Sequence, residues 1–137
     1  MIFSYTPYQL TSRIIKTTLR PMVKVRLINN TRTIETLALI DSGADTCLIN
    51  TQWAEHILFT DYKKGIIDGT AGVSGPANNV YYHDLEYELS DMPGKIFKIP
   101  FGFMKGLTES VILGRFGFFD KFKIEFDIRN NQFEIDI

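Results

Sequence analysis

Short runs of β-branched and aromatic residues, separated by Gly, Asn, Pro and Asp, recur along the whole chain. This pattern is typical of a β-rich domain with little helix. In residues 22–28, apolar Val and Leu alternate with Lys and Arg, which predicts a strand with one face in water. Residues 33–40 form a second run that ends in four consecutive apolar residues, and we expect that end to be buried on both faces.

Later segments predict more strands and few helices. A long hairpin is expected over residues 66–89. Further strands are expected at 96–103, 124–128 and 133–137, and residues 111–113 form an apolar run that we expect to be buried. Asn50 or Thr51 can cap a short helix that ends near Leu58, because either side chain can accept a hydrogen bond from a first-turn amide. The aromatic segment 116–122 is expected to form one or two helical turns.

Length, charge and cysteine content narrow the class of protein. The 137 residues suffice for one domain with its own apolar core. Fifteen basic residues nearly balance sixteen acidic ones without a block of like charge, so we expect a protein or peptide partner, and neither nucleic acid nor membrane. With one cysteine and two histidines, we expect no disulfide framework, no metal site and no cofactor. We see no signal peptide and no apolar run of ~20 residues, and expect a cytoplasmic protein.

Two of the apolar runs end at corners that contain glycine. Residues 33–40 lead into the segment Asp41-Ser42-Gly43-Ala44-Asp45, and residues 111–113 lead into Gly114 and Arg115. An acid that follows a buried strand and precedes a hydroxyl and a glycine is held rigidly yet stays accessible. Asp41 is therefore the candidate catalytic carboxylate.

Asp41 is nevertheless only half of a hydrolytic site. Peptide hydrolysis by activated water needs one carboxyl group as a base and another as an acid, and a close pair that shares a proton supplies both. The sequence contains a single Asp-Ser/Thr-Gly segment. A second copy related by a two-fold axis would bring its own Asp41 to the same place. The sequence therefore predicts that dimerisation is part of the mechanism.

Residues 38–45, Ala-Leu-Ile-Asp-Ser-Gly-Ala-Asp, resemble the active-site loop of retroviral-type aspartic proteases, the retropepsins. Residues 71–75 resemble the glycine-rich flap tip of that family, and residues 112–115, Ile-Leu-Gly-Arg, resemble its second apolar corner. The segments 20–25 and 118–127 look most like those of single-domain cellular members, particularly bacterial ones.

The resemblance implies a mainly β fold: a single-lobed, retropepsin-like closed β-barrel with a flap hairpin and one or two short helices. It covers residues 20–137, which we expect to form the protease domain. Residues 1–19 match nothing in the family, and we expect them to form an N-terminal arm of uncertain role. The activity that the resemblance implies is that of an aspartic endopeptidase which works as a homodimer on a peptide or protein substrate.

The resemblance also assigns roles to the residues of the first corner. Asp41 would be the catalytic carboxylate, and Ser42 would lock the two loops together across the dimer axis. Gly43 would touch the substrate backbone, and Ala44 would keep the cleft wall small. The two Asp41 carboxyl groups would share a proton, so that one activates water and the other protonates the scissile carbonyl oxygen, without a covalent intermediate.

Two further segments would support this loop. Asp45 would contact the substrate main chain and pair with Arg115, whose guanidinium group is suited to bidentate contact with a carboxylate. Arg115 follows Gly114 at the second corner. The flap would close over the peptide with Val73 at its tip; its residues are Ala71, Gly72, Val73, Ser74 and Gly75.

Each of these features also has an ordinary structural interpretation. An Asp-Ser-Gly segment is usually a turn, paired glycines usually mark a hairpin, and an Asp–Arg pair need not be catalytic. Cys47 is expected to be a buried small hydrophobic residue and not a nucleophile. Residues 133, 135 and 137 fit either a dimer interface or an ordinary core strand. The alternative function is a non-catalytic dimerisation or peptide-binding module with the same fold.

Overall fold

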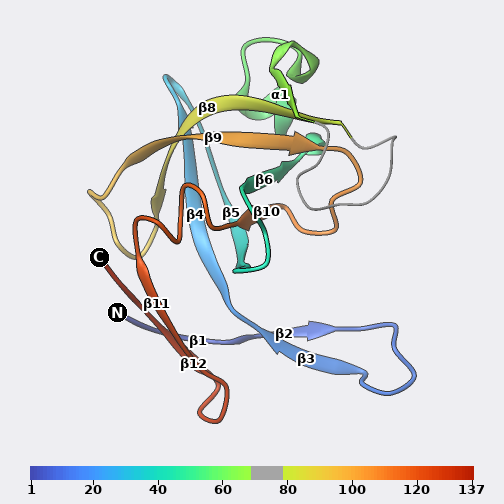
Figure 1. The fold of residues 1–137 in the computed structure, drawn as a ribbon, viewed down its shortest axis with the longest axis vertical. Coiled ribbons are helices and arrows are strands. Elements are labelled where there is room, and N and C mark those ends of the chain that lie inside the picture. Colours follow the sequence, from blue (N-terminus) through green and yellow to red (C-terminus); the bar gives the residue numbers. More distant parts are fainter. Residues whose placement is uncertain (69–78) are drawn as a thin grey trace.

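The computed structural model describes residues 1–68 and 79–137, which form a barrel with two smaller sheets beyond one end (Figure 1). Its strands are β1 (Ile2–Ser4), β2 (Thr6–Gln9), β3 (Thr17–Arg20), β4 (Met22–Asn29), β5 (Arg32–Ile40), β6 (Cys47–Asn50), β7 (Ile66–Asp68), β8 (Val80–Leu89), β9 (Phe97–Met104), β10 (Val111–Leu113), β11 (Lys123–Asp127) and β12 (Gln132–Asp136). Its helical elements are η1 (Thr51–Trp53), α1 (Ala54–Ile57) and η2 (Tyr62–Lys64). In these two ranges no helix is long and apolar enough to cross a membrane.

Six strands close the barrel. In the order β4, β5, β10, β6, β9, β8 each strand is hydrogen-bonded to the next, and β8 pairs back with β4. β10 lies parallel to β5 and β6 lies parallel to β9, whereas the other neighbours are antiparallel. Closure pairs the strand edges that an open sheet would expose. The predicted single-lobed, mainly β barrel is confirmed.

The expected hairpin over residues 66–89 is formed by β7 and β8. The two strands pair in antiparallel register, from Ile66 opposite Tyr82 to Asp68 opposite Val80. The candidate flap residues Ala71, Gly72, Val73, Ser74 and Gly75 lie outside the described residues. Their assignment to a flap stays a prediction.

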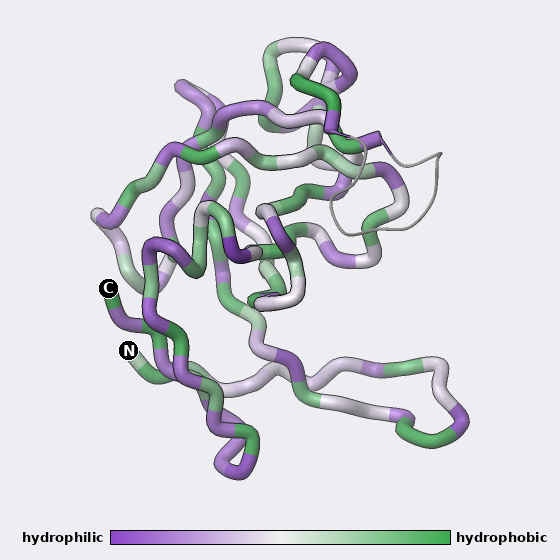
Figure 2. The backbone as a smooth tube through the Cα atoms, viewed as in Figure 1, coloured by the Kyte–Doolittle hydropathy of each residue, from purple (hydrophilic) through white to green (hydrophobic). Residues whose placement is uncertain are grey.

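Alternation along the barrel strands, visible as alternating colours in Figure 2, decides which side chains enter the core. In β4, Val23, Val25 and Leu27 are buried, while Lys24 and Arg26 face solvent. Burying one such aliphatic side chain contributes about 1.5–3 kcal/mol to folding. Large side chains that join them in the core include Tyr87, Phe101, Phe103, Phe118 and Phe133.

The end of β5 is buried on only one face, so the prediction of burial on both faces is wrong. Ala38 and Ile40 are buried, but Leu37 is 43% exposed and Leu39 is half-buried. The physical reason is that a strand in a barrel wall turns successive side chains alternately inward and outward. A run of apolar residues does not change this geometry.

The first expected helix forms and the second does not. The Asn50 side chain accepts a hydrogen bond from the Gln52 amide (3.0 Å) and caps the η1 turn that leads into α1. Residues 116–122 form turns instead of a helix. Gly117 has a φ of +103°, a left-handed conformation that interrupts an α-helix.

The strands β1, β12 and β11 form a second sheet beyond one end of the barrel, with both chain termini beside it (Figure 1). Its inner face packs on the core, where Phe133 is 1% exposed and stacks on Phe3 with ring centroids 5.3 Å apart. Ile135 is also fully buried. The core-strand interpretation therefore holds for Phe133 and Ile135, whereas Ile137 is exposed.

The strands β2 and β3 form a two-stranded hairpin that projects away from the barrel (Figure 1). Its register runs from Thr6 opposite Arg20 to Gln9 opposite Thr17. The first twenty residues thus contribute one strand to the second sheet and both strands to this projecting hairpin.

The two glycine-bearing corners pack backbone against backbone. A Cβ atom at Gly114 would collide with the carbonyl oxygen of Thr46 and lie 2.8 Å from that of Ala44. Because backbone atoms cannot swing aside as a flexible side chain can, only glycine fits there. The Gly114 amide also donates a hydrogen bond to the fully buried Cys47 Sγ (3.3 Å).

Gly114→Ala is expected to destabilise the fold by about 3 kcal/mol or more, because the added methyl group forces the two corner backbones apart. Urea-induced unfolding measures this change. Gly106→Ala is a control: Gly106 has a φ of +80°, but an added Cβ would meet nothing within 4 Å. That variant should lose only about 1–2 kcal/mol through backbone strain. Equal losses in the two variants would contradict the steric explanation.

The Cys47 thiol is expected to be unreactive in the folded protein. Burial raises the pKa of Cys47 to about 12, and the hydrogen bond from Gly114 only partly opposes this rise. At pH 8 the reactive thiolate is therefore roughly 10³-fold rarer than for a thiol of ordinary pKa. Reaction with a coloured disulfide reagent should be very slow in native buffer and rapid in denaturant. Equal rates in the two conditions would show that the sulfur is accessible.

Candidate active site

Asp41 stands where β5 leaves the barrel wall. Its amide donates a hydrogen bond to the carbonyl oxygen of Leu113 at the end of β10 (3.0 Å). The amide of Ile40 donates to the carbonyl oxygen of Pro21, just before β4 (3.0 Å). The Asp41 backbone is thus fixed between two barrel strands, while the residue itself is half-buried and reachable from solvent.

The loop then folds back on the Asp41 carboxylate. The Gly43 amide donates to Asp41 Oδ1 (2.8 Å), and the Ala44 amide donates to the Asp41 carbonyl oxygen (3.2 Å). A Cβ atom at Gly43 would approach Asp41 Oδ1 to 3.1 Å, which is a tight contact. A side-chain carboxylate that accepts from an amide two residues later is a common turn. Here the turn also holds one carboxylate oxygen in place and leaves the other available.

The remaining residues of the first corner differ in exposure. Ser42 and Gly43 are exposed, and Ala44 is buried at 9% exposure. Ser42 makes no hydrogen bond within the described part of the chain, which is compatible with the proposed contact across a dimer axis. That contact stays a prediction.

Asp45 and Arg115 form the ion pair that the resemblance implies. Arg115 Nη2 donates to Asp45 Oδ1, and both side chains are more than half exposed. The backbone supports the pair, because the Arg115 amide donates to the Ala44 carbonyl oxygen (2.9 Å) and the Phe116 amide donates to that of Asp45 (2.9 Å). Exposed pairs contribute little stability. The pair therefore orients the loop more than it stabilises the fold.

A contact beside the ion pair was not predicted from the sequence. Thr46 Oγ1 lies 2.8 Å from the Tyr82 hydroxyl oxygen, a hydrogen bond that joins the Asp41 loop to β8. Burial raises the pKa of Tyr82, so the phenol stays protonated at neutral pH. Tyr82 occupies an ordinary strand position 36 residues after Thr46, so nothing in the local pattern marks it. Tyr82 links the Asp41 loop to β8, the strand that follows the predicted flap.

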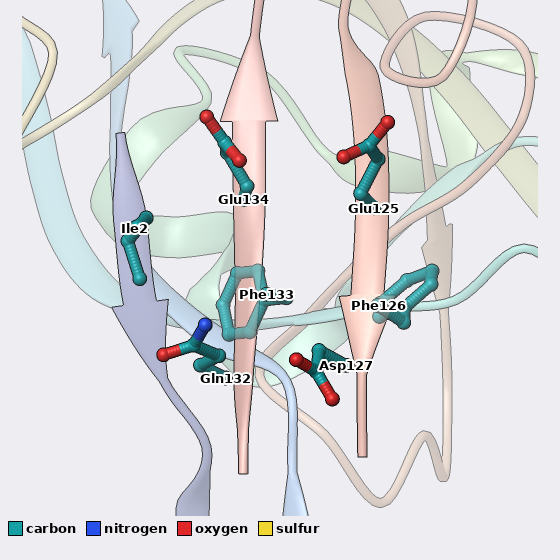
Figure 3. Close-up of a pocket in the computed structure, with 7 residues that line it drawn as sticks. All are labelled: Ile2, Glu125, Phe126, Asp127, Gln132, Phe133 and Glu134. Atoms are coloured by element: carbon teal, nitrogen blue, oxygen red, sulfur yellow. The ribbon is translucent and has the colours of Figure 1, made fainter. Parts of the chain in front are cut away.

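The other polar groups in the described residues do not form a metal site. Within residues 1–68 and 79–137, no group of three or more His, Cys, Asp and Glu residues could hold a metal ion. His83 Nε2 instead donates to the Tyr62 carbonyl oxygen (2.7 Å), and its ring meets Phe103 edge to face. A pocket of about 480 Å³ lies on the outer sheet of β1, β12 and β11, and not at the Asp41 loop (Figure 3).

The structure therefore joins the two predicted corners and leaves the flap untested. Asp41 and Asp45 lie on one loop, and Gly114 and Arg115 lie directly against it. The arrangement fixes one half-buried carboxylate in a loop whose neighbouring residues Ser42 and Gly43 are exposed. It contains one Asp-Ser-Gly loop per chain.

No family model matches the sequence, and no curated protein matches it. Among solved structures, the chain is similar to a retropepsin-like aspartic protease from Rickettsia conorii, with 18% identity and a TM-score of 0.58 over 98% of this chain and 88% of that chain. It is also similar to the retroviral protease-like domain of Ddi1 from Leishmania major, with 20% identity and a TM-score of 0.50 over 84% of this chain and 88% of that chain.

EIAV protease is 24% identical over 77% of this chain and 88% of that chain. Its TM-score of 0.38 is too low to indicate a shared fold. The first two likenesses cover most of both chains at low identity. They concern the fold, and they agree with the closed barrel and the joined corners described above. The chain has the fold of the retropepsin-like aspartic proteases.

Proposed function

We propose that this protein is an aspartic endopeptidase that works as a homodimer, with Asp41 from each copy in one shared active centre. The observation that carries the proposal is the Asp41 turn, in which a half-buried carboxylate at the end of β5 accepts a hydrogen bond from Gly43 on a retropepsin-like barrel. One chain supplies one such carboxylate. A two-fold axis beside the loop supplies the second.

The paired carboxyl groups divide the chemistry. Two carboxylates in contact cannot both ionise readily, so the pair holds one proton. The ionised group takes a proton from a water molecule, whose oxygen attacks the scissile carbonyl carbon. The protonated group gives its proton to the carbonyl oxygen. Collapse of the resulting diol breaks the C–N bond: the departing amine takes the proton that the pair holds, and one diol hydroxyl returns a proton to the pair as the product acid forms.

The rest of the loop positions the substrate. An extended peptide lies across the two copies and pairs with backbone groups on either side of the cut bond, with apolar pockets for its side chains. Gly43 and Asp45 contact its main chain, and Arg115 keeps Asp45 oriented toward it. The flap residues 71–75 close over the peptide in this proposal. The substrate is a peptide or protein, and no cofactor takes part.

Asp41→Asn is expected to lower kcat/KM for peptide cleavage by at least about 10²-fold, because an amide can neither accept nor share the proton. The assay is digestion of a mixed peptide library at several pH values, with products identified by mass spectrometry. Asp91→Asn, on the exposed turn after β8, is the matched control and should cleave like the wild type. A statine-type transition-state mimic should block the wild-type enzyme.

Three results would count against parts of this proposal. Equal cleavage by the wild type and Asp41→Asn would refute the catalytic role of Asp41. Peptide binding without turnover in either form would support the non-catalytic module instead. Cleavage by a protein that stays monomeric at micromolar concentration would refute the paired mechanism.

Arg115→Ala should separate catalysis from stability. Loss of the guanidinium group frees Asp45, and a misplaced substrate contact is expected to lower kcat/KM by about 10- to 100-fold. Stability should fall by no more than ~1 kcal/mol because the ion pair is exposed. Peptide kinetics and urea unfolding measure the two effects. Lys121→Ala, which removes the exposed ion pair with Asp120, is the control and should change neither quantity. If Arg115→Ala instead loses stability in proportion to its loss of activity, the role of Arg115 is purely structural.

A further inference from the structure

The β2–β3 hairpin is unusual because it carries its apolar side chains outside the core. Ile14 at its tip is 92% exposed, Ile15 is 52% exposed and Leu19 is 38% exposed. Figure 2 shows this hydrophobic segment at the far end of the hairpin, between two hydrophilic ones. A two-stranded hairpin alone is marginally stable in water, and exposed apolar patches on a projection mark an interaction surface.

The hairpin is anchored at its root and not along its length. Arg20 donates to the buried Glu109 (3.0 Å), and its guanidinium group covers the Tyr8 ring at 4.0 Å. Farther out, the described contacts are within the hairpin, such as the Leu10 amide to the Lys16 carbonyl oxygen (2.9 Å). The root is therefore rigid, and the outer part is free to meet a partner.

The root lies beside the catalytic loop. Pro21, which joins β3 to β4, accepts the hydrogen bond from Ile40, the residue before Asp41. If two Asp41 carboxyl groups meet at a two-fold axis, the roots of both hairpins must also lie near that axis. Seven residues of extended chain reach roughly 23 Å. Each hairpin is therefore long enough to reach the surface of the other copy.

The charges of the hairpin indicate which surface it meets. Residues 6–20 contain Arg13, Lys16 and Arg20 and no acidic residue. Arg13 and Lys16 are exposed and form no ion pair within the described residues. A basic hairpin with an apolar tip is complementary to an acidic surface that has an apolar centre.

The outer face of the β1–β12–β11 sheet is such a surface. The hollow shown in Figure 3 is lined by Ile2, Glu125, Phe126, Asp127, Gln132, Phe133 and Glu134. Phe126 and Phe133 alternate with the other five along the strands, so those five share the outer face. Glu125 and Glu134 stand directly opposite each other on neighbouring strands, an arrangement that costs stability unless a cation lies nearby. Lys123 pairs with Glu125 (2.7 Å), but Asp127 and Glu134 form no ion pair in the part of the chain that the structure describes. Asp127 accepts hydrogen bonds from the Asn130 amide (3.2 Å) and side chain (2.7 Å), which fix its carboxylate and leave its negative charge uncompensated. Ile2 is 62% exposed among these acids.

The hairpin root adjoins this sheet as well. The Tyr5 amide, between β1 and β2, donates to the Asn131 carbonyl oxygen in the turn that joins β11 to β12 (2.9 Å). Figure 1 shows the hairpin and the sheet together beyond the end of the barrel at which β5 terminates. Both surfaces therefore lie at the same end of the barrel as the Asp41 loop.

We propose that the β2–β3 hairpin is a dimerisation arm that crosses the two-fold axis and docks on the acidic outer face of the β1–β12–β11 sheet of a second copy. The exchange is reciprocal, because a two-fold axis places each arm on the other copy's sheet. Arg13 and Lys16 meet Asp127 and Glu134, and Ile14 and Ile15 cover the exposed Ile2. This inference rests on the homodimer of the proposed function and names the surface that holds it together.

Charge reversal tests the contact. Arg13→Glu with Lys16→Glu, and separately Asp127→Lys with Glu134→Lys, should each weaken the dimer by about tenfold or more, measured as Kd by analytical ultracentrifugation. The variant with all four substitutions should regain affinity, because its charges are again complementary. The wild-type dimer should weaken as salt rises. Lys95→Glu with Lys98→Glu, near the turn between β8 and β9, changes the net charge by the same amount as the arm reversal and should leave the Kd unaltered.

The contact must also be shown to lie between copies. In an equal mixture of ¹⁴N- and ¹⁵N-labelled protein, carbodiimide cross-linking should join Lys16 of one isotope to Glu134 or Asp127 of the other. Any one of three results would refute the dimerisation arm. They are cross-links confined to one isotope, a Kd that neither charge reversal changes, and no recovery of affinity in the fourfold variant. If the protein cleaves peptides as a dimer whose Kd is unchanged by the charge reversals, only this inference is refuted. A dimer that depends on the arm but does not cleave refutes only the proposed function.

Discussion

Direct backbone contact between the two glycine-bearing corners governs where every candidate catalytic group lies. Hydrogen bonds from Asp41 to Leu113 and from Arg115 to Ala44 tie the two corners together, and the position of Gly114 leaves no room for a side chain. Because these contacts are made by the main chain, they do not depend on side-chain rotamers. The barrel strands therefore hold the Asp41 carboxylate in a fixed position. The same contacts place Arg115 beside Asp45, although the two residues are 70 positions apart in the sequence.

The Asp41 loop is fixed by the barrel on one side and exposed to solvent on the other. Ser42, Asp45 and Arg115 are exposed, although backbone hydrogen bonds hold the two corners together. Exposed polar groups on a rigid loop contribute little to the stability of one copy. In the proposed homodimer, a substrate and a second copy would cover them. The Asp41 loop and the basic hairpin lie beside each other through the hydrogen bond between Ile40 and Pro21.

The sequence located most strands and the first corner, because their signals are local. Alternation in β4 and the acid after the apolar run of β5 can be read within ten residues. The predictions failed where residues distant in the sequence determine the conformation or the exposure of a segment. Leu37 faces outward because β5 is a barrel wall, and residues 116–122 form turns because Gly117 adopts a left-handed conformation against Ile99 and Cys47. The hydrogen bond between Thr46 and Tyr82 could not be predicted, because neither segment has a local pattern that indicates it.

By itself, the sequence determined that the protein is a β-rich domain with one Asp-Ser-Gly corner and one Gly-Arg corner, since periodicity and turn residues act over short distances. Only the tertiary structure decided that β8 closes on β4, that the corners interlock, and that the first twenty residues divide between a core-packed strand and a projecting hairpin. These features depend on the pairing of strands far apart in the chain, and register between such strands is fixed by the packing of the whole barrel.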